Sequence, residues 1–294
     1  MKYTPDTELK GFEMIQIEQP DDYEGKVICT VIRKKCAELC KKAVLYIHGF
    51  NDYFFQEEMA LRYNNEGFNF YALDLRKYGR SLLPHQKFTN VRDLKEYYAD
   101  IDSALNIIAE EGHDFVLLNG HSTGGLVGSL YTADNRNSNK FHAFFANSPF
   151  YDYNLGFFLR EIGVPIVKFL GGFMPNVRMK TDINTLYGES LYKDDHGEWD
   201  YNPELKRHNP PPVTFSFVRA IRNGHKRVQK GIEINVPVLV MHSDKSVYGK
   251  FWSSKFMDGD AVLNVKHTRE NAEKIKGDIR ILEIKHALHD MIMS

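Results

Sequence analysis

The stretch "LNGHSTGGLVGSL", residues 118–130, decides how this chain is organised. Its beginning belongs to a short apolar run, "DFVLLNG" (114–120), typical of a strand buried on both faces, and its end has the small apolar residues of a helix. Between them, residues 120–124 form a G-x-S-x-G pattern. A sharp strand-to-helix turn crowds the backbone, so glycines must flank its central residue, whose side chain then stands at the carboxyl edge of the sheet. The pattern predicts that Ser122 is a nucleophile.

Strand and helix patterns alternate along most of the chain. Runs rich in β-branched residues are separated by segments whose apolar residues recur three and four positions apart. In the long amphipathic segment 90–112, Asn90 is a candidate N-cap and Gly112 a candidate end. Such alternation predicts an α/β fold with a mostly parallel central sheet flanked by helices. We expect strands over 26–35, 42–50, 68–75, 114–120, 141–149, 236–244 and 278–286, and helices over 53–67, 90–112, after Ser122 and over 265–276.

Residues 150–232 interrupt this alternation. Short apolar segments such as "FFLREIGVPIVKFLGGFMP" (157–175) precede the polar stretch "YKDDHGEWDYNPELKRHNPPP" (192–212). A structureless loop of this length is uncommon in a compact domain. We therefore predict a cap of short helices over 150–232, inserted into a core formed by residues 1–149 and 233–294.

Composition excludes several classes of partner. The chain has 38 Lys and Arg against 39 Asp and Glu, so no overall field attracts nucleic acid or an anionic membrane. Its first residues lack the apolar core of a signal peptide, and no run of about 18 apolar residues occurs. We expect a cytoplasmic protein without a nucleic-acid partner or stable membrane insertion. Cys29, Cys36 and Cys40 are expected to be free thiols, because the step from Cys36 to Cys40 lacks a second pair of zinc ligands.

A serine hydroxyl needs a base to remove its proton, and two histidines near the C-terminus are candidates. His289 lies in the loop just beyond the last predicted strand, where that loop can turn over the sheet edge toward Ser122. His286 lies where the strand ends and is expected to be structural. We therefore favour His289 as the general base.

The imidazole needs a carboxylate that orients it and stabilises its charged form. Asp244 directly follows the predicted strand 236–244, whereas Asp260 comes later in the chain. One predicted helix and one predicted strand fill the interval from Asp260 to His289, and this spacing favours Asp260. Asp244 stays open as the alternative acid, and Asp258 is a weaker third candidate.

Acyl transfer also needs N–H donors for the oxyanion. In this architecture one donor is the residue after the nucleophile, here Thr123, and another lies in the loop after an earlier strand. "YIHGFND" (46–52) supplies that loop, so the Phe50 N–H is the expected second donor. Asn51 and His121 are expected to line the substrate pocket.

These motifs together resemble the α/β-hydrolase superfamily, especially its monoacylglycerol lipase-like, lysophospholipase-like and serine aminopeptidase-like branch. The resemblance rests on "HGF" after a strand, "LDLRKYGRS" (73–81), "GHSTGG" (120–125), an inserted cap, and an acid and a terminal histidine that follow the serine in that order. It covers nearly the whole chain beyond about residue 25. Lys77 replaces the family's usual glycine, which we expect to be harmless at a surface turn.

The resemblance implies hydrolysis of an ester or amide through an acyl-enzyme, without metal or organic cofactor. A small-molecule ester, such as a monoacylglycerol or lysophospholipid, is the expected substrate, because the apolar cap run could cover an acyl chain. An aminopeptidase is one alternative, since Asp194, Asp195, Glu198 or Asp200 could hold a substrate ammonium. A ligand-binding protein with a disabled triad is another. The apolar cap run comprises Phe157, Phe158, Leu159, Ile166, Val167, Phe169, Leu170, Phe173 and Met174.

Overall fold

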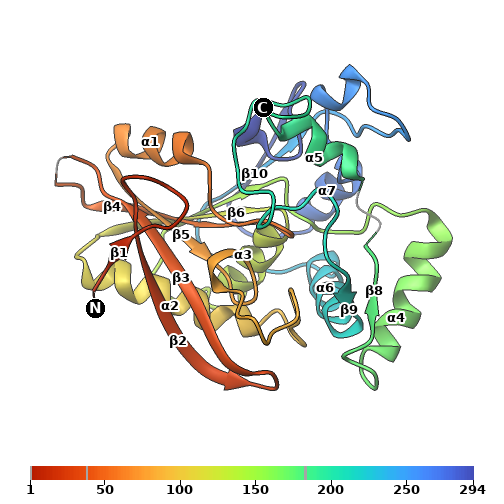
Figure 1. The fold of residues 1–294 in the computed structure, drawn as a ribbon, viewed down its shortest axis with the longest axis horizontal. Coiled ribbons are helices and arrows are strands. Elements are labelled where there is room, and N and C mark those ends of the chain that lie inside the picture. Colours follow the sequence, from red (N-terminus) through yellow and green to blue (C-terminus); the bar gives the residue numbers. More distant parts are fainter. Residues whose placement is uncertain (1, 38, 182–183) are drawn as a thin grey trace.

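A twisted sheet flanked by helices runs through the centre of the molecule (Figure 1). The computed structural model describes residues 2–37, 39–181 and 184–294. Over these residues nine strands form the sheet in the order β1-β2-β3-β5-β4-β6-β7-β10-β11. Neighbours from β5 to β11 are parallel, and those from β1 to β5 are antiparallel. The strands are β1 (Thr4–Pro5), β2 (Glu13–Asp22), β3 (Gly25–Lys34), β4 (Lys42–Ile47), β5 (Phe68–Asp74), β6 (Phe115–His121), β7 (Ala143–Asn147), β10 (Val238–Ser243) and β11 (Ile279–Ile284).

Successive residues of β4 point to opposite faces of the sheet and into two separate cores. Leu45 and Ile47 join the larger core, to which α2, α3 and α6 contribute. Val44 and Tyr46 join the smaller core, which contains Met59 of α1. Both faces of the sheet are thus buried, which explains the near-continuous apolar character of its inner strands. The α-helices are α1 (Glu57–Asn65), α2 (Glu96–Glu110), α3 (Thr123–Asp134), α4 (Val164–Leu170), α5 (Thr185–Leu191), α6 (Phe215–Gln229) and α7 (Val265–Ala272).

The mostly parallel sheet confirms the predicted α/β fold, with differences at some boundaries. Asn90 does not cap a helix, because α2 begins only at Glu96. The Asn90 side chain is buried and accepts hydrogen bonds from the hydroxyls of Thr214 and Ser216 instead. The antiparallel strand β2 was absent from the sequence prediction, since its polar residues alternate with few apolar ones.

Residues 150–232, the predicted cap, hold a π-helical turn (Leu159–Gly163), α4, α5, α6 and a two-stranded sheet of β8 (Arg178–Met179) and β9 (Val213–Thr214). Helices α4 and α6 lie side by side at the right of Figure 1. Helix α6 also packs against α3 and adds Phe217 and Ile221 to the larger core. The division into core and cap stays a prediction.

The expectation of three free thiols is wrong for two of the cysteines. Cys36 and Cys40 form a disulfide in the connection between β3 and β4, whereas Cys29 is free and buried. The turn brings the two Cα atoms to 6.7 Å, within bonding range. The spacing of zinc ligands, on which the expectation was based, does not address such a local bond.

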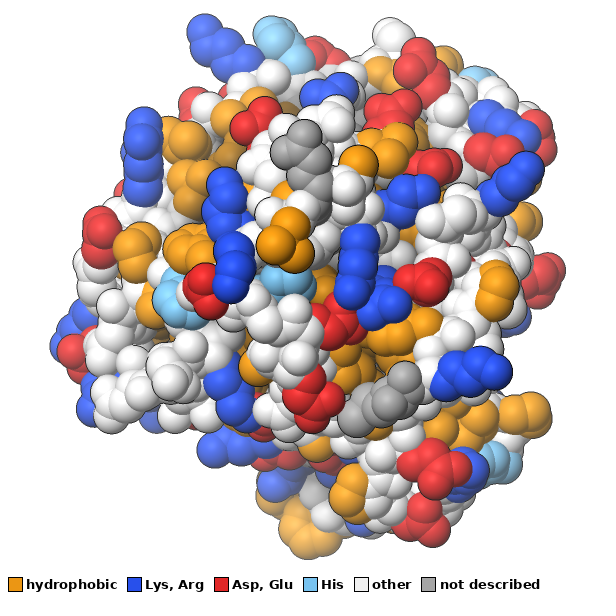
Figure 2. Space-filling view, turned by 90° about the vertical axis from the view of Figure 1, so that its left-hand side faces the viewer, with side chains coloured by type: hydrophobic (Ala, Val, Ile, Leu, Met, Phe, Trp, Pro, Cys, Tyr) orange, Lys and Arg blue, Asp and Glu red, His pale blue; other side chains and the backbone are white. Residues whose placement is uncertain are grey.

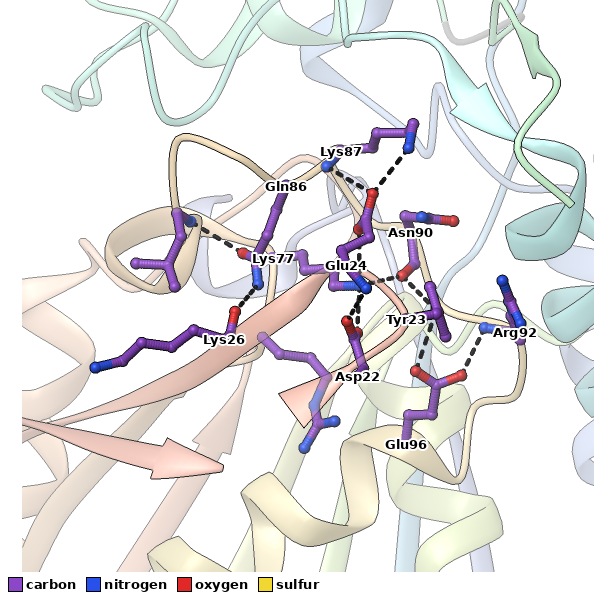
Figure 3. Close-up of polar contacts among 12 residues, drawn as sticks. Asp22, Tyr23, Glu24, Lys26, Lys77, Gln86, Lys87, Asn90, Arg92 and Glu96 are labelled. Atoms are coloured by element: carbon purple, nitrogen blue, oxygen red, sulfur yellow. Dashed lines mark hydrogen bonds and ion pairs between the residues drawn. The ribbon is translucent and has the colours of Figure 1, made fainter. Parts of the chain in front are cut away.

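The expectation that Lys77 lies at a surface turn is also wrong. Its side chain is fully buried, at a backbone φ of 64°. The ammonium lies among Asp22, Glu24 and the carbonyl of Asn90 (Figure 3). The β2–β3 hairpin, which the sequence did not reveal, folds over this position and closes it off from solvent.

Basic and acidic side chains are interspersed over the face that looks left in Figure 1 (Figure 2). This mixture fits the formal net charge of −1. Within the described part of the chain, no helix combines the length and the apolar character needed to cross a bilayer.

Candidate active site

Ser122 lies in a strained turn between β6 and α3. Its φ and ψ are 51° and −113°, a conformation that non-glycine residues adopt only under constraint, at a cost of about 1–3 kcal/mol. A Cβ on Gly120 would lie 2.5 Å from the carbonyl oxygen of Gly124, and one on Gly124 would collide with the carbonyl oxygen of Ile47. Only glycine fits at both positions, so the flanking glycines of the motif are required by the packing of the turn.

His289 and Asp260 form a buried pair. His289 Nδ1 lies 2.9 Å from Asp260 Oδ2, and both side chains are at most 3% exposed. The other carboxylate oxygen, Oδ1, accepts hydrogen bonds of 2.7 Å from the N–H groups of Val262 and Leu263. If Nδ1 donates its proton to Asp260, then Nε2 carries the lone pair that a general base needs.

The two other candidate acids lie away from His289. Asp244 Oδ1 accepts the N–H of His286 at 2.9 Å. Asp258 pairs with the exposed imidazole of His286 and with Lys245. The structure therefore brings Asp260, and neither alternative, to His289.

Ser122 and His289 line one cavity, together with the predicted pocket residues Asn51 and His121. The ring of His121 lies 4.9 Å from that of His289, between centroids. The remaining lining residues come from the loop after β4, from the predicted cap and from the turn after Asp260. They are Phe50, Asp52, Asn184, Tyr187, Gly188, Tyr201, Lys206, Arg207, His208, Pro210 and Val262.

Of the two predicted oxyanion donors, Phe50 lines this cavity, and Thr123 directly follows the lining residue Ser122. Among the described residues, neither the Phe50 N–H nor the Thr123 N–H donates a hydrogen bond to another protein group. The Phe50 ring packs against those of Phe88 and Phe217, at centroid distances of 5.6 and 5.8 Å. The loop that carries the Phe50 N–H is thus held by aromatic packing.

A buried ion pair joins this loop to the predicted cap. Lys206 Nζ lies 2.9 Å from Asp52 Oδ1, and His121 Nδ1 lies 3.7 Å from Asp52 Oδ2. Burial opposes ionisation of Asp52, but the Lys206 ammonium, followed by His121, holds the pKa of this carboxyl well below its usual range. Sequence reasoning missed both partners. Asp52 directly follows the "HGFN" stretch and was within reach of that reasoning, whereas nothing local marks Lys206.

The apolar run of the predicted cap does not line the cavity. Phe157, Phe158, Phe169 and Phe173 are 65–75% exposed, and Leu159, Ile166 and Met174 are also exposed. The expectation that this run covers an acyl chain is therefore wrong for this conformation. Within helix α4, Val164 and Val167 lie on the inner side and pack in the larger core.

Metal ligation requires several donor side chains that converge on one point. In residues 2–37, 39–181 and 184–294, no three His, Cys, Asp or Glu side chains are arranged to hold an ion.

Known structures with the same fold cover nearly the whole chain. A soluble variant of monoglyceride lipase from Saccharomyces cerevisiae, in complex with a substrate analogue, has a TM-score of 0.65 at 16% identity, with 95% of this chain and 91% of that chain covered. Monoacylglycerol lipase from Paleococcus ferrophilus has a TM-score of 0.63 at 20% identity, with 88% and 90% covered. Est1E from Butyrivibrio proteoclasticus has a TM-score of 0.56 at 14% identity, with 94% and 90% covered.

Sequence comparison gives the family. No curated protein matches the chain significantly. The profile of the family described as serine aminopeptidase, S33, matches residues 39–293, which span the Ser122 turn, the predicted cap and the His289 loop. The chain therefore belongs to the serine aminopeptidase S33 family of α/β-hydrolases.

Proposed function

We propose that the chain is a serine hydrolase that cleaves carboxylic esters through an acyl-enzyme. Ser122 is the nucleophile, His289 the general base and Asp260 the carboxylate that orients it. One observation carries this proposal: His289, which pairs with the buried Asp260, lines the same cavity as Ser122, the residue of the strained turn. Strain of this kind persists at functional sites because the surrounding fold holds it.

The proposed reaction uses only groups at this cavity. His289 Nε2 takes the Ser122 proton while Oγ attacks the ester carbonyl carbon, and the Phe50 and Thr123 N–H groups stabilise the oxyanion. His289 then gives the proton to the leaving alkoxide as the C–O bond breaks. Water, deprotonated by His289, attacks the acyl-enzyme and releases the acid and free Ser122. Asp260 stabilises the imidazolium in both steps.

Ester hydrolysis is favoured over aminopeptidase action by the charges at the cavity. A substrate ammonium needs an unpaired carboxylate, and none of the described lining residues is Asp194, Asp195, Glu198 or Asp200. The one acid that lines the cavity among the described residues, Asp52, already pairs with Lys206. The wall beside Ser122 thus suits a neutral leaving group.

A leaving alcohol with further free hydroxyl groups suits that wall of the cavity. Nε2 of the buried His121 has no hydrogen-bond partner among the described residues, and Nδ1 has only Asp52 Oδ2 at 3.7 Å, beyond hydrogen-bond range. A polar group left in this state costs free energy until a ligand or water supplies a hydrogen bond. Monoacylglycerols release such an alcohol, and it is neutral. The proteins of similar fold from Saccharomyces cerevisiae and Paleococcus ferrophilus are named monoglyceride lipase and monoacylglycerol lipase, which supports this class as the first to test.

The test compares wild type with Ser122→Ala on p-nitrophenyl esters of short and medium chain, then on monoacylglycerols and aminoacyl amides. We expect ester turnover that Ser122→Ala abolishes and amide turnover at least about a hundredfold lower. Turnover retained in Ser122→Ala would refute the nucleophile. A preference for aminoacyl amides would establish the aminopeptidase. No turnover and no fluorophosphonate adduct in folded wild type would leave the ligand-binding alternative.

A further inference from the structure

Lys77 is a buried cation whose charge the proposed reaction does not use. Its Nζ lies 2.5 Å from Asp22 Oδ2, 2.9 Å from Glu24 Oε2 and 2.7 Å from the carbonyl oxygen of Asn90 (Figure 3). The Lys77 side chain is fully buried, and each carboxylate is at most 10% exposed. A buried ion pair adds little net stability, because desolvation offsets its attraction. We therefore infer the role of this cluster from the segments that it holds together, rather than from its effect on stability.

Lys77 holds the loop formed by residues 87–91 through its side chain and its backbone. Besides the bond from Nζ to Asn90, its carbonyl accepts the N–H of Thr89 at 3.3 Å. Glu24, which pairs with Lys77, also binds Lys87 Nζ at 3.0 Å (Figure 3). Lys77 thus fixes this loop to the tip of the β2–β3 hairpin.

The same loop positions both aromatic neighbours of Phe50. Phe88 belongs to the loop and packs edge-on against the Phe50 ring. Asn90 Oδ1 accepts the hydroxyls of Thr214 and Ser216 at 3.1 Å each, at the start of α6. Phe217 of that helix stacks on the Phe50 ring, and its N–H donates to the Thr214 hydroxyl.

We propose that Lys77 is a positioning residue for the oxyanion site: it fixes the loop whose Phe88 packs against Phe50 and whose Asn90 holds the start of α6, which carries the second aromatic neighbour of Phe50. This inference rests on the proposed function, in which the Phe50 N–H stabilises the oxyanion. An oxyanion donor acts mainly in the transition state, so its displacement lowers kcat more than it raises KM.

The test substitutes Lys77→Met, which keeps the length and apolar stem of the side chain and removes its charge. Arg33→Met is the matched control, because Arg33 likewise pairs with two carboxylates, those of Glu13 and Glu111, but does not touch the 87–91 loop. For a p-nitrophenyl ester we expect Lys77→Met to lower kcat about tenfold or more, with KM within about twofold. Arg33→Met should lower the urea midpoint while kcat stays within about twofold.

Lys77→Arg keeps the charge and should restore at least part of the lost kcat. In the double variant Lys77→Met/Phe88→Leu, the fold-loss of kcat should be smaller than the product of the two single fold-losses, because both substitutions act on Phe50. Where Lys77→Met does not fold, Ser216→Ala removes one donor to Asn90 and leaves the ion pairs intact, and a lowered kcat is again expected.

Two failures are distinguishable. Wild type without esterase activity or Ser122 labelling would overturn the proposed function, and the role of Lys77 would fall with it. An active wild type whose kcat survives both Lys77→Met and Ser216→Ala would overturn the positioning role alone. The same holds if Lys77→Met changes only the urea midpoint, as Arg33→Met does, because Lys77 would then be purely structural.

Discussion

Substitution of Asp260 by Asn tests the proposed triad most directly, because the surroundings of this side chain dictate how the amide must lie. Asp260 Oδ1 accepts two backbone N–H groups at 2.7 Å, from Val262 and Leu263, and only an oxygen can keep those bonds. In the variant, the nitrogen of the new side-chain amide must then face His289 Nδ1, at the position of the present 2.9 Å contact. Nδ1 becomes an acceptor, so Nε2 carries the proton and cannot take one from Ser122.

The loss has two parts. A carboxylate about 4 Å from an imidazolium, at an effective dielectric constant of about 20, contributes about 4 kcal/mol of attraction. At 1.36 kcal/mol per tenfold change, this attraction alone corresponds to a factor of about 10³ in kcat. The wrong tautomer adds to it, so we expect a loss of about 10³–10⁴ for Asp260→Asn, as is typical when a triad aspartate is amidated.

The assay measures kcat and KM with a p-nitrophenyl ester, together with the rate of fluorophosphonate labelling of Ser122 mapped by mass spectrometry. Asp244→Asn is the control, because Asp244 contacts the backbone of His286 rather than the imidazole of His289. Its kcat should fall less than about tenfold. A loss under tenfold in Asp260→Asn, or an equal loss in Asp244→Asn, would refute the reasoning.

Other predictions concern stability. Gly124→Ala should lower the free energy of unfolding by about 3 kcal/mol or more in urea titrations, because its Cβ would collide with the carbonyl of Ile47, and a loss under about 1 kcal/mol would contradict the crowding. Replacement of Cys36 and Cys40 by Ser should cost about 2 kcal/mol, since the closed loop is short, and should leave kcat unchanged; a lowered kcat would show that the turn reaches the site. Burial, followed by Arg222, lowers the pKa of His225 to about 3 from 6.5, so the unfolded chain binds more protons between these values. The contribution of His225 to the free energy of unfolding is complete above about pH 6.5 and should be lost by up to about 1.4 kcal/mol per pH unit as the pH falls toward 3. His225→Phe should remove this one-proton part of the slope of stability against pH, and an unchanged slope would contradict the assignment.

Most of the correct predictions came from patterns within short stretches of the sequence. The G-x-S-x-G stretch predicts the turn at Ser122 because its two glycines respond to contacts within a few residues and with the adjacent strand. Alternation of strand and helix patterns predicts the parallel sheet, since each element must bury one face against the next. Local reasoning failed at Asn90, where a residue suited to an N-cap instead binds Thr214 and Ser216, both remote in sequence.

The proposed acid shows what sequence spacing can and cannot predict. The interval between Asp260 and His289 favours Asp260 because one helix and one strand fill it, and the folded chain places that carboxylate on the imidazole. Spacing left Asp244 open, since both residues follow the same strand toward the same edge of the sheet. The orientation of the side chains separates them, and orientation depends on the packing of the whole turn.

The sequence by itself determined the α/β architecture, the position of Ser122 at its turn and the order of serine, acid and histidine, because these depend on residue type and periodicity along the chain. Only the tertiary structure decided that Lys77 is buried beneath a hairpin, that Lys206 reaches Asp52 and that most of the apolar cap run is exposed. Each of these depends on which distant segments meet. Burial and ion pairing are properties of an environment assembled from remote residues, and no local pattern specifies them.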